Sequence, residues 1–298
     1  MKNKYLALAD SGIIALINPL NGQLVSLFIE RELMHPGGRF VDDPERDIDG
    51  WANSGLIMFP IVSASKDNIV SYEGKKYALD QHGMARSLIP KCSLAPSAKS
   101  KIRNSSIINY NYKKNTDINN IKYVKGQKNP KIMKLPFSFE ILEEYFINAN
   151  EKRLEITTSI RNRFKKPFCY ALGRHPAFIS NSENYMDCAF YDSNGKEVIT
   201  LAKLMELSKT RAYIMHGEKS VIAYDNRSKK GVHLWTDFGN IMLWSPKENM
   251  FCMEPITDRV GNNDIELDLS RKGSYRDVLY SGDTKKYHTM IMVADKRI

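Results

Sequence analysis

Alternation of apolar and polar residues is the dominant pattern along this chain, and it predicts β-strands. Residues 153–162 (RLEITTSIRN) alternate with a period of two, as expected for a strand with one buried face. Residues 137–141 begin the same way, 145–147 continue as an apolar run, and 148–152 are predicted to be a turn. Asn21-Gly22 is typical of a hairpin turn. Further strands are expected at 12–18, 23–30, 68–73, 106–112, 120–125, 231–236, 240–244, 250–254 and 287–294.

Helical periodicity is confined to one segment, residues 196–208 (KEVITLAKLMELS), where apolar residues gather near one face of a short helix. Many short strands separated by turn signals predict an all-β fold, either a sandwich or a barrel. The stretch 91–134 is rich in Lys, Asn and Ser, but strand-like pieces interrupt it. We therefore expect a single domain over residues 1–298, with exposed hairpins in that stretch.

Composition narrows the classes of partner. The chain has 298 residues, 42% of them apolar, which is enough for a sizeable core, and its net charge is +10. The Lys and Arg residues are spread along the chain, and no basic run alternates with aromatics, so no nucleic acid partner is expected. Apolar runs are too short for a membrane span, and the first apolar stretch is too short for a signal peptide. The expectation is a cytoplasmic protein without a membrane partner.

Cofactor and metal motifs are missing from the sequence. No glycine-rich nucleotide motif, H-E-x-x-H or G-x-S-x-G is present, and the acidic segment 42–50 lacks the ligand order of a calcium loop. The four cysteines form no C-x-x-C pair and too few possible bridges for a disulfide framework, so we expect reduced and mostly buried thiols. These are Cys92, Cys169, Cys188 and Cys252. Neither a cofactor nor a metal is expected.

Three short clusters, at 72–86, 172–178 and 243–255, carry the candidate chemistry. Within the third, Glu254 follows an apolar run and precedes a proline. A carboxylate at the end of a buried strand is costly to desolvate unless it is paired or functional. Desolvation would raise its pKa toward the range that suits a general base. A structural interpretation, in which an Arg or backbone donors satisfy the carboxylate, stays open.

In this order, the clusters resemble the aldose 1-epimerase (galactose mutarotase-like) family, and most of all the branch with hexose-6-phosphate mutarotases and lactose-operon relatives. The resemblance covers about residues 10–290. It implies a large antiparallel β-sandwich with few short helices, no cofactor, and a small-molecule sugar or sugar phosphate as partner. The motifs that carry it are Phe59-Pro60-Ile61, Tyr72–Tyr77 (YEGKKY), His82–Arg86 (HGMAR), Gly173–Phe178 (GRHPAF) and Glu254-Pro255.

The resemblance also implies roles for single residues. Glu254 matches the general base and His175 the general acid, while His82 matches a histidine that contacts the sugar. Arg86 matches an arginine near the substrate that helps to hold a phosphate in the phosphosugar branch. Anomer exchange needs only such acid/base groups, because the hemiacetal opens when C1–OH loses a proton and the ring oxygen gains one.

Two positions depart from the family pattern. Relatives carry Gly-Arg after the F-P-[IV] motif, whereas this chain has Ala64 there, with Lys66 as a candidate substitute for the lost arginine. Arg174 stands where an apolar or aromatic residue is usual. A positive charge at this position is expected either to lower the pKa of His175 or to bind an anionic group of the substrate. These basic residues favour a phosphorylated or otherwise acidic sugar.

Aromatic residues near the motifs are candidates for stacking on a pyranose or for core packing: Trp244, and also Trp51 and Phe178. The oligomeric state is expected to be a monomer or homodimer. Two further functions stay open. One is a non-catalytic sugar-binding protein on the same fold. The other is a lyase or hydrolase, which requires a second carboxylate across the sugar, with candidates Asp237, Asp258 and Asp264.

Overall fold

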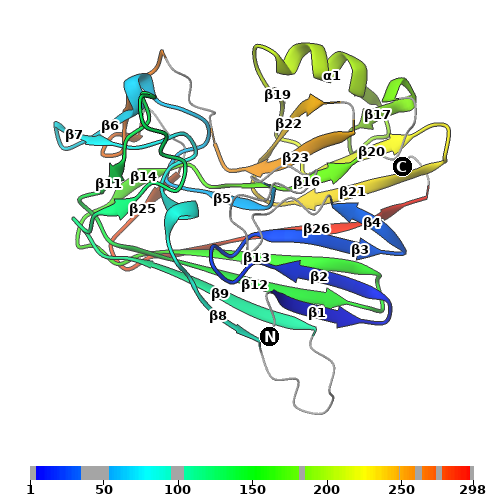
Figure 1. The fold of residues 1–298 in the computed structure, drawn as a ribbon, viewed down its shortest axis with the longest axis horizontal. Helices are drawn as coiled ribbons and strands as arrows, with labels where there is room; N and C mark the ends of the chain where they lie inside the picture. The colour runs from blue at the N-terminus through cyan, green and yellow to red at the C-terminus, as the bar shows by residue number, and fades with distance from the viewer. Residues whose placement is uncertain are drawn as a thin grey trace.

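Two large, mainly antiparallel β-sheets dominate the computed structural model (Figure 1). The structure describes residues 5–34, 54–94, 104–180, 185–247, 249–258, 264–272 and 277–295. Trp51 and the acidic segment 42–50 lie outside the described residues. The expected all-β sandwich is confirmed.

The first sheet has ten strands and holds the N-terminal hairpins together with the strands of two sequence motifs. Its order is β1-β2-β3-β4-β16-β23-β15-β5, and β22 pairs with β23 and β19. The strands are β1 (Leu6–Asp10), β2 (Ile13–Ile17), β3 (Leu24–Ile29), β4 (Arg31–Met34), β5 (Leu56–Met58), β15 (Gly173–His175), β16 (Ala177–Ile179), β19 (Tyr213–His216), β22 (Asn240–Lys247) and β23 (Met250–Ile256).

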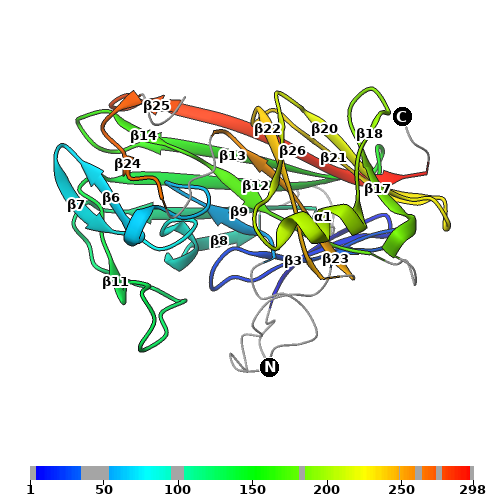
Figure 2. The ribbon, with the colours of Figure 1, turned by 90° about the horizontal axis from the view of Figure 1, so that it is seen from above.

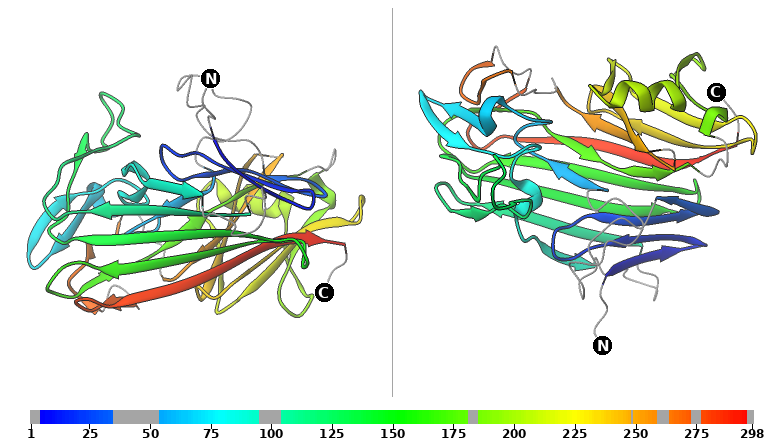
Figure 3. Two further views of the ribbon diagram at one scale, coloured as in Figure 1. Left: turned by 90° about the horizontal axis from the view of Figure 1, so that it is seen from below. Right: turned by 45° about the horizontal axis from the view of Figure 1, so that its top comes forward.

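The second sheet has nine strands in the order β18-β17-β20-β21-β26-β13-β12-β9-β8. Its three longest strands, β12, β13 and β26, run side by side across the molecule (Figure 3). The strands are β8 (Lys91–Leu94), β9 (Ser105–Tyr112), β12 (Phe139–Asn148), β13 (Arg153–Asn162), β17 (Cys188–Tyr191), β18 (Glu197–Thr200), β20 (Ser220–Asp225), β21 (Lys230–Thr236) and β26 (Thr284–Ala294).

Three small sheets complete the strand set, and the hairpin of β6 and β7 lies at the end of the molecule away from the α-helix (Figures 1 and 2). The parallel pairing of β24 with β6 departs from the antiparallel pattern. The strands are β6 (Ile69–Tyr72), β7 (Lys75–Ala78), β10 (Ile118–Asn119), β11 (Ile132–Met133), β14 (Phe168–Tyr170), β24 (Leu267–Asp268) and β25 (Asp277–Leu279).

Period-two burial creates the core between the sheets. In β12 the residues at 139, 141, 143, 145 and 147 are buried, while 144 and 146 are exposed. Four of these five inward residues are apolar or aromatic, and the fifth is Glu143. One contiguous apolar cluster joins inward residues of both large sheets, for example Ala15 and Ile156. The predicted strand 153–162 is β13, and the apolar runs 137–141 and 145–147 belong largely to the single strand β12.

The predicted strand at 120–125 is wrong. These residues form turns and irregular chain between the short strands β10 and β11. Their apolar members Ile121, Tyr123 and Val124 are 46%, 37% and 49% exposed, so the segment has no face to bury against a sheet. Local apolar content without a packing partner does not form a strand.

The predicted helix over 196–208 is confirmed only in its second half, as α1 (Leu201–Ser208). Residues 197–200 form β18 and pair with β17, because their β-branched side chains suit a sheet better than a helix. Thr200 then caps the helix, its hydroxyl accepting a hydrogen bond from the Lys203 N–H. Leu201 and Leu204 are buried, and the helix packs against β22 (Figure 2).

The remaining helices are single 3₁₀ turns: η1 (Lys66–Asn68), η2 (Ala85–Ser87) and η3 (Tyr185–Asp187). No helix among the described residues has the length and apolar character that a membrane crossing needs. All four cysteines are free thiols, and three of them, Cys169, Cys188 and Cys252, are buried, as expected.

Candidate active site

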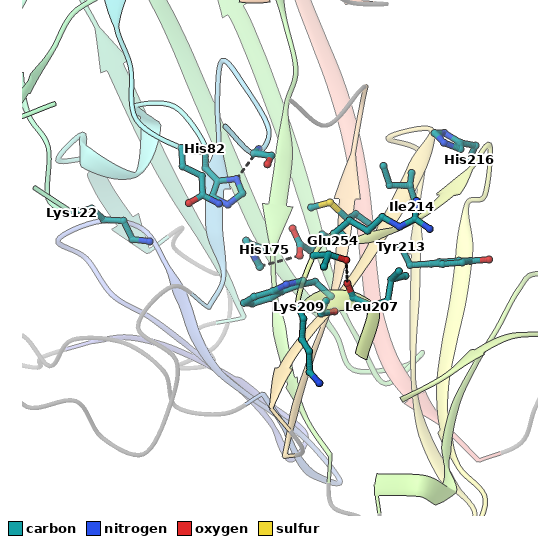
Figure 4. A pocket seen from close by; sticks show the side chains of 17 residues that line it. His82, Lys122, His175, Leu207, Lys209, Tyr213, Ile214, His216 and Glu254 are labelled. Carbon is teal, nitrogen blue, oxygen red and sulfur yellow. Dashed lines mark hydrogen bonds and ion pairs between the residues drawn. The ribbon is translucent and has the colours of Figure 1, made fainter. Parts of the chain in front are cut away.

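A cavity of about 790 Å³ opens on the face of the first sheet where β15, β22 and β23 meet (Figure 4). Its size falls in the range of about 300–1,000 Å³ that is usual for small-molecule sites. Four residues predicted from the sequence line it: His82, His175, Trp244 and Glu254. The segments that contribute them lie as far apart as 172 positions in the sequence, and the sheet brings them together.

Strand register places His175 opposite Glu254. β15 and β16 pair with β23 through Gly173↔Ile256 and Ala177↔Cys252, and these two pairs bracket the two catalytic candidates. Directly opposed residues on antiparallel strands have Cβ atoms about 4.5–5.5 Å apart, close enough for their side chains to meet. The His175 Nδ1 and Glu254 Oε1 atoms are 3.5 Å apart.

The Glu254 carboxyl group is buried without the usual compensation. Its side chain is 1% exposed, and neither oxygen accepts a hydrogen bond from the described residues. Desolvation therefore raises the pKa of Glu254 well above its ordinary value of 4.5. A buried carboxyl group that faces a cavity and lacks donors is a common feature of functional sites.

The pKa of His175 moves in the opposite direction. Burial first, and then the positive charges of Lys122 and Arg86, lower it from 6.5 to about 3. These positive charges are on Lys122 and Arg86, and Arg174 is not among them. The two shifts have opposite directions, so the Glu254 carboxyl group holds a proton more strongly than the His175 ring does.

His82 is held in one tautomer by the backbone. Its Nδ1 atom accepts a hydrogen bond of 3.0 Å from the Ser63 N–H, so the neutral ring carries its proton on Nε2. Burial, His175, Arg86 and Lys122 lower its pKa well below 6.5. The imidazole is therefore a neutral hydrogen-bond donor toward the cavity.

The motif around His82 needs glycine next to it. Gly83 has φ +74°, and a Cβ there would lie 2.0 Å from the Phe59 carbonyl oxygen. The Phe59 N–H donates to the His82 carbonyl at 3.1 Å. The H-G-M-A-R and F-P-I motifs thus form one folded unit, which presents the His82 ring to the cavity.

Aromatic rings flank His175 on two sides. Trp244 is half-buried, and its ring lies perpendicular to the His175 ring at a centroid distance of 6.1 Å. His82 lies perpendicular to His175 at 5.4 Å. Phe178 is fully buried and stacks on Phe251, so it packs in the core and does not line the cavity.

Arg86 supports the His82 loop from beneath and does not line the cavity. Its side chain is 1% exposed and forms an ion pair of 3.1 Å with Asp80. Asp80 also accepts hydrogen bonds from the Gln81 N–H and the Asn120 side chain. The positive charge of Arg86 therefore lowers the pKa of His82 and His175 only from a distance.

Arg174 points into the space between the two sheets, away from the cavity. It forms an ion pair with Glu143 of β12, donates a hydrogen bond of 2.7 Å to the Tyr145 hydroxyl, and lies over the Tyr145 ring at 5.3 Å. Lys66 is exposed in η1 and does not line the cavity either. The structure does not bring these two cations into the site with the histidines.

Sequence reasoning missed several residues that line the cavity. Met242 of β22 pairs with Glu254 and is visible only from the strand register. Lys122 comes from the segment that was predicted to be a strand. Lys209 and Arg211 follow the end of α1, where a basic residue after a helix carries no distinctive signal.

One trio of metal-type donors is present at the site. His175, Cys252 and Glu254 each offer one ligand atom, and these atoms all lie within 4.8 Å of one another. Zinc holds nitrogen, oxygen and sulfur donors at about 2.0–2.3 Å, so two donors of one zinc ion lie less than twice that distance apart. Donor atoms separated by 4.8 Å would therefore have to move closer together to bind one zinc ion.

Neither a protein-family model nor a curated protein sequence matches this chain. Solved structures do. A galactose mutarotase related enzyme from Lactobacillus acidophilus has a TM-score of 0.72 at 20% identity, over 97% of both chains. A galactose mutarotase-like protein from Lactobacillus casei has 0.72 at 17%, over 97% of this chain and 100% of the other. A putative aldose 1-epimerase from Escherichia coli has 0.65 at 12%, over 97% and 98%. The chain therefore has the galactose mutarotase-like fold.

Proposed function

We propose that this protein is an aldose 1-epimerase that interconverts the α and β anomers of a hexose or hexose phosphate. One observation carries the proposal: Glu254 and His175 form a buried pair, 3.5 Å apart, at a cavity of about 790 Å³, and the carboxyl group has no hydrogen-bond donor among the described residues. Proteins with the same fold, a galactose mutarotase related enzyme and a putative aldose 1-epimerase, support it.

The reaction needs one base and one acid on the same hemiacetal. Glu254 removes the proton from the C1 hydroxyl while His175 gives a proton to the ring oxygen, so the bond between C1 and the ring oxygen breaks and C1 becomes a carbonyl. Rotation about the C1–C2 bond then presents the other face of the carbonyl. Ring closure reverses both proton transfers, and each group returns to its starting state. Each group contributes a factor of about 10²–10⁴ to the rate.

Substrate binding sets the ionisation state that this reaction uses. In the free protein the opposite pKa shifts keep the shared proton on Glu254. A sugar hydroxyl that donates to the carboxylate supplies the hydrogen bond that Glu254 lacks, and this stabilises its charged form. The proton then moves to His175, whose Nδ1 lies 3.5 Å from the carboxylate oxygen.

His82 and Trp244 are proposed to hold the sugar. The Nε2–H of His82 faces a fixed direction because Ser63 occupies Nδ1, so it can donate to a sugar hydroxyl or to the opened carbonyl. The half-buried Trp244 ring lines the cavity beside His175 and suits stacking on the apolar face of a pyranose.

A two-carboxylate hydrolysis has less support. Glu254 is the one carboxyl group that lines the cavity among the described residues, whereas glycosidases use a pair. Of the earlier candidates, Asp237 accepts hydrogen bonds from the His288 backbone and side chain, and Asp258 and Asp264 do not line the cavity.

The test is anomer exchange measured by saturation-transfer NMR with glucose, galactose and glucose 6-phosphate. We expect the protein to accelerate exchange of at least one of these, and the acceleration to be lost in Glu254→Gln and His175→Asn. Thermal melting of each variant checks that it is folded. Saturable sugar binding by a folded protein without any acceleration would instead support the non-catalytic sugar-binding function.

A further inference from the structure

The cavity lining carries an excess of positive charge. Among the described residues that line it, three carry a full positive charge, Lys122, Lys209 and Arg211, and the single acid is the buried Glu254. Because burial raises the pKa of Glu254, this acid does little to offset the cations in the free protein. The three cations come from two separate segments, the chain between β10 and β11 and the chain after α1.

Lys122 is the best anchored of the three. Its N–H donates to the Asn120 side chain at 3.0 Å, and its carbonyl accepts from the Asn129 side chain at 2.5 Å. Asn120 is buried and donates in turn to Asp80 at 2.9 Å. Asp80 also binds Arg86, which belongs to the H-G-M-A-R motif, so one network links the backbone at Lys122 to the loop that carries His82.

The charge of Lys122 has a cost for the proposed reaction. It lowers the pKa of both His82 and His175, and so it opposes the protonation that His175 needs as an acid. A neutral sugar leaves this opposition in place. An anionic group bound to Lys122 neutralises the charge and makes protonation of His175 easier. The position of Lys122 is thus unfavourable for neutral substrates and favourable for anionic ones.

The other two cations, Lys209 and Arg211, differ in whether an ion pair within the protein already engages their charge. Lys209 pairs with Glu206 at 2.6 Å on the exposed surface, whereas Arg211 is exposed and makes no ion pair with the described residues. Figure 4 shows Lys122 to one side of His175 and Glu254 with its nitrogen directed toward them, whereas the Lys209 side chain extends away from them. Lys122 is therefore the cation best placed to bind an anionic substituent that lies away from C1.

We propose that the substrate is an aldose that carries an anionic group, a phosphate monoester or a carboxylate, and that Lys122 is the residue that selects it. This inference rests on the proposed function. It assigns the anion to Lys122, and not to Arg86, Arg174 or Lys66, because those three side chains do not line the cavity. An ammonium group binds either kind of anion through charge-assisted hydrogen bonds.

The experiment compares kcat/KM for anomer exchange of glucose, glucose 6-phosphate and glucuronate. We expect at least one anionic sugar to exceed glucose, and Lys122→Met to reduce that preference about tenfold to a hundredfold, the effect of one lost charge-assisted hydrogen bond. Lys122→Arg should keep most of the preference, which separates a role of charge from a structural one. The two anionic sugars show whether phosphate or carboxylate is preferred.

Lys125 provides the matched control. It lies three residues along the same segment, is exposed and does not line the cavity, so Lys125→Met should leave the preference unchanged. Equal acceleration of neutral and anionic sugars, or a preference that survives Lys122→Met in a folded protein, would overturn this inference and leave the epimerase intact. No acceleration of any of the three sugars would instead overturn the proposed function.

Discussion

Strand β15 places two buried ionisable side chains on its opposite faces, and the comparison between them separates structure from function. Arg174 faces the space between the sheets and pairs with Glu143, and these side chains are 3% and 1% exposed. His175 faces the cavity and lies beside Glu254, with 5% and 1% exposed. Burial is therefore nearly the same for the two pairs.

Hydrogen bonding distinguishes them. The Glu143 carboxylate accepts a hydrogen bond from the Tyr145 hydroxyl at 3.3 Å in addition to its ion pair with Arg174, and the Tyr110 hydroxyl lies 3.4 Å away. Glu254 accepts none from the described residues and borders a cavity. A buried carboxylate with a charge partner and hydroxyl donors holds two sheets together, whereas a buried carboxyl group without donors at a cavity is available to a ligand. Burial of a carboxylate alone would not have told the two apart.

The largest expected effect concerns the cavity side of the strand. His175→Asn removes the proposed acid, and we expect kcat for anomer exchange to fall by about 10²–10⁴. The melting temperature should change little, because the rings that contact His175, Trp244 and His82, also line the cavity and Asn keeps a polar side chain there. Polarimetry or NMR exchange, together with thermal melting, measures both. Full activity in the variant would remove His175 from the mechanism.

The next effect concerns the core side. Arg174→Met leaves the Glu143 carboxylate buried without its charge partner, and we expect the free energy of unfolding to fall by about 3–5 kcal/mol. The double variant Arg174→Met with Glu143→Met should recover much of that loss, since it removes both charges. Denaturant unfolding tests this. A single variant as stable as the wild type would show that the pair does not stabilise the sandwich.

A smaller effect appears in the pH dependence of stability. Since the folded-state pKa of Glu254 is raised above 4.5, the folded protein holds a proton that the unfolded chain releases. Below pH 4.5 the wild type and Glu254→Gln should be equally stable. As pH rises toward the raised pKa, the wild type should lose about 1.4 kcal/mol per pH unit relative to the variant. Unfolding curves at several pH values with no such divergence would contradict the assigned environment of Glu254.

The smallest effect is expected at Trp244. Trp244→Leu removes an aromatic surface from the cavity but no group that transfers a proton. We expect KM to rise about threefold to tenfold, corresponding to about 0.5–1.5 kcal/mol of stacking, with kcat nearly unchanged. Steady-state kinetics separates the two constants. A loss confined to kcat would indicate that Trp244 acts on His175 and not on the sugar.

The sequence allowed much of the fold to be predicted, because alternation is a local signal. β13 was predicted with its observed bounds, and Glu143 could have been recognised as a buried charge, since it occupies an inward position of β12. Its partner could not have been identified in the same way. Arg174 lies 31 positions away in the other sheet, and only the packing of the two sheets brings them together.

The site was predicted in part for related reasons. Motif order identified His82, His175 and Glu254, and Trp244 was a stacking candidate near the motifs; all four line the cavity. Arg174 could have been excluded, because adjacent residues of a strand face opposite sides and His175 was already assigned to the site. Lys122 gave no usable signal, since its segment has apolar residues that resemble a strand and only the fold shows them to be exposed.

The central claim is that Glu254 and Glu143, two buried carboxylates of the same protein, have different functions. Saturation-transfer NMR with glucose 6-phosphate and with glucose tests it directly, on Glu254→Gln and Glu143→Gln at equal concentrations of folded protein. We predict that Glu254→Gln loses the acceleration of anomer exchange, by about 10²–10⁴, while Glu143→Gln keeps most of it and is the less stable of the two. Equal activity in the two variants would contradict the account.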